Sequence, residues 1–499
     1  MKKLLALMLV FLAGSGVLSC RAETTETTLS TTAATPIDQE GIALFPKQSQ
    51  GFIGDPMPYF DGTQLNLFYL HDARDGMRGF HPWYLFQTSD FLHWEDRGEA
   101  IPYVNDYASQ DLALGTGSVI KDADGLYHAF YTGYNGTGNV DYKEKIQHAV
   151  STDLVQWTKI PEDGFYGGVD DFRDPYVLYM EETGEYWMLV VTRVNNRGVL
   201  KRFTSTDLSR WTDRGVFYEN DAGTWNMECP TLIRYNGYWY LSYSEQGLNR
   251  IVHYRYKADL ADPWIRPTVD WFDGIGFYAG RLEAAYGRLF AFGWVGTKTY
   301  DYDGGDFAWA GNLVTHELVQ RENGELRPKP TDEAVAALSR EVVREVLRAS
   351  VDPVADATAF HRAAGYEYVL YGPLSTNATR LTFTARIETD AGRFGLTFDC
   401  GEEAYGEVNV VFDVEHDAIA FYNVAPSKIA ASLPQISLPY AMAAGQTLDV
   451  TVLMQGECLT VYVDGELALT TRMYGLTGDP FGFFGMRSDA TIREVRFHE

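Results

Sequence analysis

One phrase recurs along the first half of the chain and constrains its fold more than any other feature. It reads Thr88-Ser-Asp-Phe-Leu-His-Trp94, then Ser151-Thr-Asp-Leu-Val-Gln-Trp157, then Ser205-Thr-Asp-Leu-Ser-Arg-Trp211, and a weaker copy ends at Trp264. Successive tryptophans lie 63, 54 and 53 residues apart. A β-rich repeat of this period with one aromatic signature per unit is typical of a β-propeller.

Strand and turn patterns between these phrases agree with that interpretation. Aromatic and alternating runs such as Trp83-Tyr-Leu-Phe precede the phrases, and Asp-Gly and Asn-Gly dipeptides separate the runs as hairpin turns do. Residues 39–330 therefore predict a five-bladed propeller of about four strands per blade. The repeated phrase itself is interpreted as structural, a turn followed by a tryptophan that packs between blades, so its three aspartates are not expected in the chemistry.

The pattern changes near residue 330. Residues 331–348 carry good helix formers after a threonine that can cap a helix, which predicts a linker with a short helix. Beyond it, runs such as Arg380-Leu-Thr-Phe-Thr-Ala-Arg386 alternate polar and apolar residues, which predicts a β-sandwich over residues 349–499. The predicted fold class is all-β, a five-bladed β-propeller followed by a C-terminal β-sandwich.

The N-terminus has the pattern of a targeting segment. Lys2 and Lys3 precede an apolar run, and small residues lead to Cys20. A cysteine at this place resembles the lipobox of bacterial lipoproteins, which implies that residues 1–20 are a lipoprotein signal peptide with Cys20 as the lipidated residue. The alternative is an ordinary signal peptide with an incidental cysteine. Residues 21–38 then form a Thr-rich tether, and the expected location is the cell envelope, lipid-anchored on the surface or periplasmic face of a bacterial membrane.

Charge and cysteine content exclude several other classes. Lys and Arg total 41 against 68 Asp and Glu, a formal charge of −27, which argues against a nucleic-acid partner. The cysteines beyond the N-terminus, Cys229, Cys400 and Cys458, are too few for a disulfide framework, and pairing of Cys400 with Cys458 is left open. Cys and His do not cluster with zinc-ligand spacing, so neither a metal nor a cofactor is expected.

Three carboxylates stand in local contexts that suggest chemistry. Asp55 and Asp174 each precede a proline at the start of a predicted first strand of a blade, and Glu228 lies in a matching position one blade further on. The Asp-Pro dipeptide alone is weak evidence, because it occurs five times in the chain. First strands of successive blades converge on the propeller axis, so the three carboxylates are expected to face one pocket.

These carboxylates lie in motifs that resemble a known family. Gly54-Asp-Pro, Phe172-Arg-Asp-Pro175 and Met227-Glu-Cys-Pro230, in this order, resemble the three signature motifs of glycoside hydrolase family 32, the family of invertases, inulinases and levanases. Further matches are Gly117-Ser118, Asp273-Gly-x-x-Phe-Tyr-Ala279, Phe292-Gly-Trp294 and Trp309-Ala-Gly-x-Leu-Val-Thr-His-Glu-Leu318. The resemblance spans roughly residues 50–330 and extends weakly into the C-terminal region.

The resemblance implies a retaining mechanism without cofactor or metal. Asp55 is then the nucleophile, Glu228 the acid/base and Asp174 the stabiliser of the transition state. A retaining pair requires Glu228 protonated and Asp55 ionised, and hydrogen bonds or Arg173 are expected to keep Asp55 ionised. The expected substrate-binding residues are Arg173, His71, Trp83, Thr116 and Tyr278.

The motifs also depart from the family's usual pattern. Gly54 and Met57 stand where asparagines flank the nucleophile in the family, and Thr116 replaces a serine. These departures leave the exact substrate open.

The expected activity is release of fructose from β-D-fructofuranosides such as sucrose, fructo-oligosaccharides, inulin or levan. The expected partner is an oligo- or polysaccharide that contains fructofuranosyl units, with membrane contact only through the lipid anchor. The alternatives are a fructosyltransferase, a hydrolase of another furanoside as in arabinofuranosidases, and a non-catalytic glycan-binding lipoprotein. The Glu-Cys-Pro motif favours the fructan enzymes.

Overall fold

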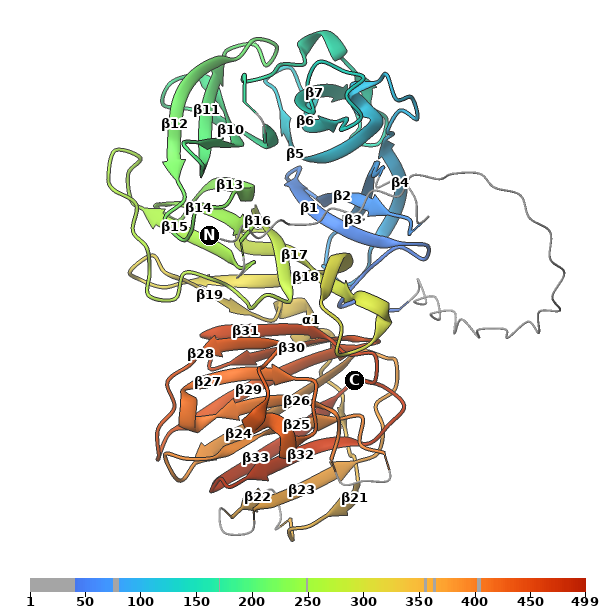
Figure 1. Cartoon of the computed structure of the whole chain (residues 1–499), viewed down its shortest axis with the longest axis vertical. Coiled ribbons are helices and arrows are strands. Elements are labelled where there is room, and N and C mark those ends of the chain that lie inside the picture. Colours follow the sequence, from blue (N-terminus) through green and yellow to red (C-terminus); the bar gives the residue numbers. More distant parts are fainter. Residues whose placement is uncertain are drawn as a thin grey trace, which may run out of the picture. The chain divides into compact units, whose positions relative to one another are not determined.

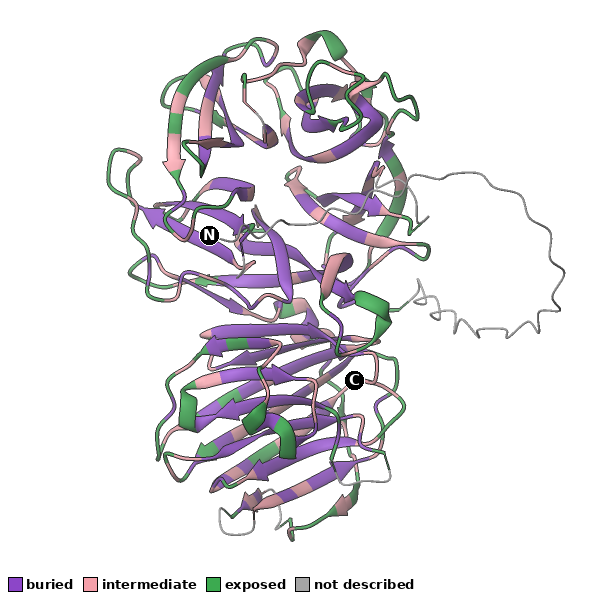
Figure 2. Ribbon diagram, in the orientation of Figure 1, coloured by how far each residue is buried: buried purple, intermediate pink, exposed green. Residues whose placement is uncertain are grey.

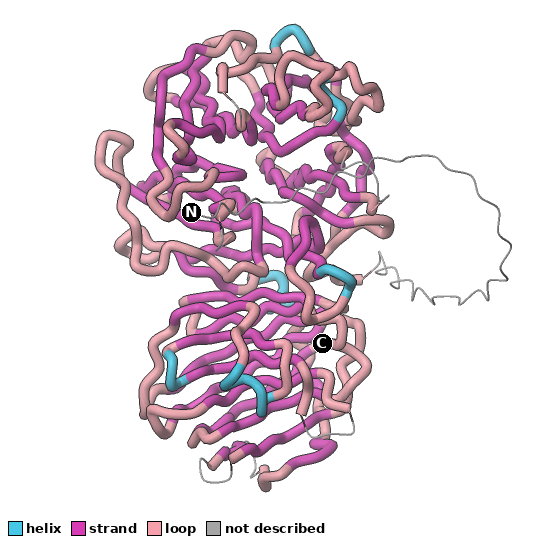
Figure 3. Tube along the Cα trace, in the orientation of Figure 1, coloured by secondary structure: helices cyan, strands magenta, loops and turns pink. Residues whose placement is uncertain are grey.

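The structure of the chain is a computed structural model that describes residues 41–74, 80–169, 171–247, 250–353, 357–361, 365–401 and 405–499. The predicted signal peptide with Cys20 and the predicted tether at 21–38 lie outside the described residues. Strands dominate the described part and its helices are short (Figure 3), so the expectation of an all-β fold is confirmed. None of the described helices has both the length and the apolar character needed to cross a membrane.

Residues 52–329 form antiparallel sheets of three to eight strands (Figure 1). An eight-stranded sheet has the order β16-β17-β18-β1-β2-β3-β4, with β19 paired to β18. Its strands are β1 (Phe52–Phe60), β2 (Leu65–Asp72), β3 (Trp83–Thr88), β4 (Glu95–Ile101), β16 (Phe277–Ala285), β17 (Arg288–Lys298), β18 (Phe307–Gln320) and β19 (Leu326–Lys329).

Three smaller sheets are built from strands that follow one another in the chain. The first contains β5 (Ala113–Lys121), β6 (Tyr127–Tyr134), β7 (Glu144–Ser151) and β8 (Thr158–Lys159). The second contains β9 (Arg173–Met180), β10 (Glu185–Val194), β11 (Arg197–Ser205) and β12 (Thr212–Glu219). The third contains β13 (Met227–Tyr235), β14 (Tyr238–Glu245) and β15 (Val252–Lys257).

The first strands of these groups lie next to one another in a ring. Strand β1 contacts β5, β5 contacts β9, β9 contacts β13, β13 contacts β16, and β16 contacts β1. We call these five the inner strands. Ile53 of β1 also pairs with Gly311 of β18, which joins β1–β4 and β16–β19 into one sheet. Segments far apart in the sequence therefore meet at one place.

The repeated phrase forms a tight turn held by its own side chains. In the second copy, Ser151 Oγ accepts a 2.9 Å hydrogen bond from the amide of Leu154, whose φ is 67°. Asp153 Oδ1 accepts one of 2.8 Å from the amide of Gln156. The copies at 88–94 and 205–211 make the same two bonds. The phrase is thus an ST- and Asx-type turn, and the interpretation of its aspartates as structural is confirmed.

The tryptophans that end the second and third copies pack across neighbouring sheets. The ring of Trp157 lies 5.8 Å from that of Phe68 on β2, edge to face, and the ring of Trp211 lies 5.4 Å from that of Phe130 on β6. Aromatic pairs in this arrangement add stability beyond the area they bury. Each of these two tryptophans therefore attaches its own sheet to the preceding one.

The C-terminal region is a β-sandwich of two seven-stranded sheets, and most residues of its strands are buried (Figure 2). One sheet contains β20 (Glu341–Val342), β22 (Ala357–Phe360), β24 (Thr379–Ile387), β29 (Thr447–Gln455), β30 (Cys458–Val463), β31 (Leu467–Arg472) and β33 (Ala490–His498). The other contains β21 (Val346–Ala349), β23 (Tyr366–Tyr371), β25 (Arg393–Phe398), β26 (Val408–Asp413), β27 (Ala418–Tyr422), β28 (Ile436–Pro439) and β32 (Phe481–Met486). Alternate residues of β24 are buried in the common core, as the period-two pattern predicts.

Helix α1 (Asp332–Ala337) is shorter than the sequence pattern predicts. Thr331 caps it by accepting a 3.2 Å hydrogen bond from the amide of Ala334, and the helix ends before Leu338. The residues that follow form β20 and β21 instead, because Val342 pairs with Phe497 in the sandwich. Tertiary pairing thus overrides helix propensity in this segment. The other described helices are 3₁₀ turns at Gln110–Leu112, Pro161–Asp163, Thr299–Asp301, Val414–His416 and Pro426–Ala431.

A buried carboxylate links the loop before β16 to the sandwich. Asp273 is fully buried and accepts hydrogen bonds from the amide of Thr470 at 2.8 Å and from Nε2 of His316 at 3.0 Å. Asp273 opens one of the sequence motifs noted above, so this part of the motif serves the contact with β31. The three described cysteines are free and buried, so Cys400 and Cys458 do not pair.

Candidate active site

A cavity of about 460 Å³ lies where the inner strands meet. The three predicted carboxylates, Asp55, Asp174 and Glu228, all line it. Eight further residues complete the lining: Gly115, Thr116, Arg173, Cys229, Gln246, Arg250, Tyr278 and Trp309. Side chains from β1, β5, β9, β13 and β16 are therefore brought together as the sequence analysis predicts.

The same backbone irregularity occurs in all five inner strands. The register with the adjacent strand shifts between Gly54 and Met57 in β1, and at matching places in β5, β9, β13 and β16. Within these bulges φ is 38° at Asp55, 54° at Asp174 and 52° at Cys229. A β-bulge interrupts the ladder and redirects side chains, and aspartate is among the residues that tolerate positive φ best. The bulges thus present the carboxylates to the cavity.

Asp174 is held on both oxygens by protein donors. Its Oδ1 accepts a 2.5 Å hydrogen bond from Oγ1 of Thr116, and its Oδ2 accepts one of 3.0 Å from the amide of Cys229. Its own amide donates to Oγ1 of Thr132 at 2.9 Å. Its side chain is 5% exposed, so this carboxylate has a fixed orientation.

Glu228 is held by one charged and one neutral donor. Arg173 Nη2 donates to its Oε1 at 3.0 Å, and the Tyr278 hydroxyl donates to its Oε2 at 2.7 Å. Burial raises the pKa of Glu228 above its usual range, and the negative charge of Asp174 adds to this, while Arg173 and Tyr278 oppose it. The net direction favours a carboxyl that can carry a proton.

Asp55 has a different environment. Trp294 Nε1 donates a 3.1 Å hydrogen bond to its Oδ1. Burial raises the pKa of Asp55 to about 7, and the charge of Asp174 adds to the shift, while the bond from Trp294 and the charge of Arg281 lower it. The carboxyl therefore titrates close to neutral pH.

Arg173 lies among acidic groups but does not pair with the candidate nucleophile. Its Nη1 lies 2.9 Å from Oδ1 of Asp171 and 3.3 Å from Oε1 of Glu144, and its Nη2 binds Glu228. The sequence analysis named Arg173 as one possible support for ionised Asp55. In the structure its ion pairs go to the acid/base side of the cavity.

Two of the predicted substrate-binding residues are not among the described residues that line the cavity. His71 Nε2 lies 2.8 Å from the carbonyl oxygen of Gln50, and its ring stacks on that of Tyr84 at 4.2 Å. Trp83 is fully buried and donates a 2.9 Å hydrogen bond from Nε1 to the carbonyl of Gly115. Trp83 thus supports the backbone of a lining residue.

The sequence analysis did not assign a role to four other lining residues, Cys229, Gln246, Arg250 and Trp309. The guanidinium carbon of Arg250 lies 4.5 Å from the centroid of the Tyr278 ring. Trp309 fills the space beside Gly54, where an added Cβ would lie 2.3 Å from its Cζ2. Cys229 and Trp309 stand in motifs already noted, which is a usable signal. Gln246 and Arg250 follow β14 outside any motif.

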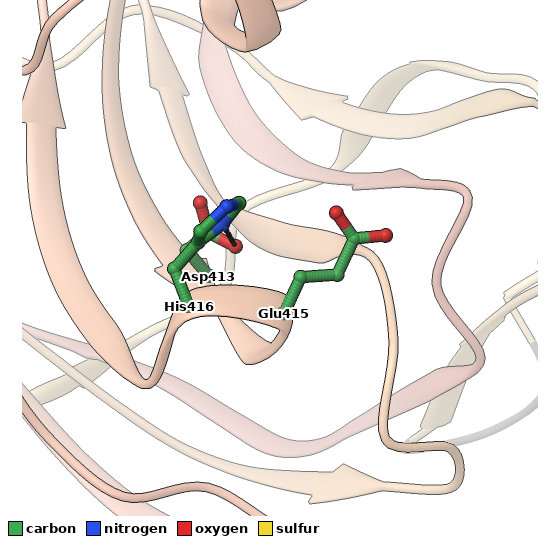
Figure 4. A group of neighbouring side chains, drawn as sticks. All are labelled: Asp413, Glu415 and His416. Carbon is green, nitrogen blue, oxygen red and sulfur yellow. Dashed lines mark hydrogen bonds and ion pairs between the residues drawn. The ribbon is translucent and has the colours of Figure 1, made fainter.

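One group of potential metal ligands occurs among the described residues, in the sandwich. Asp413 and His416 face each other while Glu415 extends away (Figure 4). Arg393 already occupies this group, with Nε 2.8 Å from Oδ2 of Asp413 and Nη2 3.2 Å from Nδ1 of His416. A guanidinium among these ligand atoms competes with a cation, so we assign no metal to them.

Comparison with known proteins identifies relatives along most of the chain. The family model described as "Glycosyl hydrolases family 32 N-terminal domain" matches residues 47–330. The chain is similar to a sucrose-6-phosphate hydrolase of Escherichia coli, 24% identical over 451 residues that cover 85% of this chain and 87% of the relative. It is also similar to a levanbiose-producing levanase of Bacillus subtilis, 26% identical over 330 residues that cover 60% of each chain.

Solved structures show the same fold. The sucrose-6-phosphate hydrolase of Lactobacillus gasseri superposes with a TM-score of 0.68 at 19% identity, covering 94% of each chain. The exo-inulinase of Aspergillus awamori superposes with a TM-score of 0.67 at 15% identity, covering 94% of this chain and 98% of its own. The likeness includes both the region around the cavity and the sandwich.

Proposed function

The chain belongs to glycosyl hydrolase family 32, and from this we propose that it hydrolyses β-D-fructofuranosides with retention of configuration. It is a glycosidase that acts on O-glycosyl bonds. Candidate substrates are sucrose, its 6-phosphate, fructo-oligosaccharides, inulin and levan. The observation that carries the proposal is the convergence of Asp55, Asp174 and Glu228 from three inner strands on one cavity.

In the first step Asp55 attacks the anomeric carbon of the fructosyl unit. The bond from this carbon to the leaving-group oxygen breaks as Glu228 donates its proton to that oxygen. A covalent fructosyl-enzyme results, and Glu228 becomes a carboxylate. Arg173 and Tyr278, which donate to its two oxygens, stabilise that charged form.

In the second step Glu228 takes a proton from a water molecule, which attacks the same carbon. The bond to Asp55 breaks, and fructose leaves with its original configuration. Asp174 stabilises positive charge on the sugar ring in both steps. Its two oxygens already accept bonds from Thr116 and Cys229, so it needs little reorganisation when that charge develops.

We assign the architecture around the cavity to five propeller blades. They are β1–β4, β5–β8, β9–β12, β13–β15 and β16–β19, and the ring of contacts among the inner strands supports this division. The sandwich acts as a structural partner, which agrees with the bond from Thr470 to Asp273. Cys20 is the lipidated residue that holds the enzyme on the bacterial cell envelope, and the lipobox pattern supports this assignment.

The test is a measurement of fructose release from sucrose, sucrose 6-phosphate, a short fructo-oligosaccharide, inulin and levan. The variant Glu228→Gln serves as the inactive form, and Glu182→Gln, whose side chain is 57% exposed, serves as the matched control. Release that is lost only in Glu228→Gln supports the proposal.

Absence of release from all five substrates by a cooperatively folded protein contradicts the proposal. Release from an arabinofuranoside in their place assigns another furanoside. Accumulation of longer fructosyl products at high sucrose identifies a transferase.

A further inference from the structure

Arg281, on inner strand β16, is a buried cation that the mechanism above does not use. Its side chain is 1% exposed, and Nη1 donates a 2.9 Å hydrogen bond to the carbonyl of Pro230. Its Nε and Nη2 have no hydrogen-bond partner among the described residues. Burial of an incompletely paired guanidinium costs several kcal/mol. A residue kept at this cost needs a reason beyond packing.

The position of Arg281 places it next to the catalytic groups. It closes the bulge of β16 that begins at Tyr278. Pro230, its acceptor, follows Glu228 by two residues on β13. The guanidinium carbon also lies 5.9 Å from the ring centroid of Tyr176, two residues after Asp174 on β9. Arg281 is therefore enclosed by the same inner strands that present the carboxylates.

The charges around Asp55 leave this cation a distinct task. Asp174 on β9 and Glu228 on β13 act on Asp55 as negative groups, and Trp294 on β17 donates a hydrogen bond to it. Among the described residues no Lys, Arg or His forms an ion pair with Asp55. The positive charge that acts on it is that of Arg281.

Two further titratable groups lie near this strand, and each is accounted for. Glu283, also on β16, is turned to the amide of Phe60, which donates to it at 3.2 Å. Tyr176 presents its ring to Arg281. Arg173 is committed to Glu228, Glu144 and Asp171. The two buried arginines thus act on opposite members of the catalytic pair.

We propose that Arg281 is a positioning residue whose buried charge keeps Asp55 ionised while Glu228 retains its proton. The proposal rests on the roles proposed above for these two carboxyls. It follows from Coulomb attraction at low effective dielectric, which acts without direct contact. Arg173 cannot serve the same end, because its charge favours ionisation of Glu228.

The first experiment compares the pH dependence of kcat/KM in the full-length protein, Arg281→Gln and Arg281→Lys. A glutamine can still donate to Pro230 but carries no charge. We expect the acidic limb, which reports ionisation of Asp55, to move up by about one pH unit in Arg281→Gln, with about a tenfold loss of kcat/KM below it. In Arg281→Lys the limb stays within about half that distance, and the basic limb is unchanged in both variants.

A merely structural role predicts a different result. Loss of packing lowers activity at every pH without moving one limb alone, and an unmoved acidic limb in folded Arg281→Gln overturns the proposal. The matched control is Arg255→Lys, since Arg255 on β15 is fully buried but pairs with Asp221 and Asp270 away from the cavity. This control lowers the melting temperature and leaves both limbs in place.

The second experiment needs no activity, so it separates failure of this inference from failure of the proposed function. Thermal unfolding at pH 8 is measured for Asp55→Asn, Arg281→Gln and the double variant. We expect loss of Arg281 to lower the melting temperature less when Asp55 is already neutral. Additive changes overturn the proposal. If Arg281→Gln alone does not fold, the double variant is expected to fold, and its failure also overturns the proposal.

Discussion

The hydroxyl of Tyr278 donates a 2.7 Å hydrogen bond to Oε2 of Glu228, the carboxylate oxygen that Arg173 leaves free. The two residues come from adjacent inner strands, β16 and β13. The bond favours the charged carboxylate and thus lowers the pKa of Glu228 against the effect of burial.

Replacement of Tyr278 by phenylalanine therefore moves the pKa of Glu228 upward. Because the acid must be protonated for the first step, the basic limb of the kcat/KM profile is expected to shift to higher pH by roughly half a unit to one unit. The control is Tyr240→Phe, which removes an equally buried hydroxyl that donates to the carbonyl of Gly324. A basic limb that moves to lower pH in Tyr278→Phe contradicts the assignment of Glu228.

The wild-type enzyme is expected to gain activity as pH rises through about 7, because the pKa of Asp55 is raised to about 7 and only its ionised form attacks. Activity falls again as Glu228 loses its proton. A pH profile of kcat/KM on the best substrate measures both limbs. A profile that is already flat between pH 4 and pH 6 is incompatible with the environment of Asp55 described here.

Asp55 also links pH to stability. Its folded pKa of about 7 exceeds the unfolded value of about 3.9, so the folded protein binds a proton that the unfolded chain releases between these values. The stability associated with this group therefore falls as pH rises from about 4 to about 7. Asp55→Asn removes the penalty and is expected to raise the melting temperature by roughly a few degrees at pH 8, with little gain at pH 4.

A turn aspartate provides the opposite control for that measurement. Amides of Arg210 and Ser209 lower the pKa of Asp207 to about 2. Asp207→Asn is expected to destabilise the protein at pH 8, and the loss shrinks as pH falls from about 4 toward about 2. Equal pH trends for the two variants contradict the difference between a catalytic and a structural carboxylate.

Gly54 and Trp309 are expected to be coupled. A Cβ at residue 54 would lie 2.3 Å from Cζ2 of Trp309, so Gly54→Ala displaces a ring that lines the cavity. We expect a stability loss of about 1–3 kcal/mol and a raised KM. The loss becomes smaller in a Trp309→Ala background. Gly372→Ala, where an added Cβ meets open space, is the control, and equal losses at the two glycines contradict the coupling.

Cys20→Ser tests the proposed anchor. The variant is expected to leave the membrane fraction of the producing bacterium while its kcat stays within about twofold, since the cavity is built from residues 55–309. Cell fractionation with an activity assay measures both. Retention of the variant in the membrane fraction argues against lipidation at this cysteine.

Much of the site follows from sequence because its groups stand in ordered motifs on strands that the repeat predicts. Asp55, Asp174 and Glu228 illustrate this, since each lies on the first strand of its group. The backbone bulges and their positive φ values leave no comparable signal, because they result from how the inner strands meet. Trp83 shows the limit of residue type as a guide. Its aromatic ring suits a sugar, yet burial and a bond to Gly115 give it a supporting role.

The segment after α1 shows why local preference fails where long-range pairing competes. Helix formers fill residues 338–348, but partners such as Phe497 recruit this segment into the sandwich. Gln246 and Arg250 were missed for the opposite reason. They stand in a loop whose course depends on contacts that no local pattern encodes.

The pairing of Ile53 with Gly311 has a consequence for synthesis of the chain. Strand β1, which carries Asp55, is translated early, whereas β18 is complete only when more than 250 further residues have followed. Until then one edge of β1 has no partner in the nascent polypeptide and is open to wrong pairing or chaperone binding. Trp294, the donor to Asp55, also emerges late. A nascent chain therefore gains its nucleophile's environment in one late event, and premature termination before Gly311 yields an inactive product.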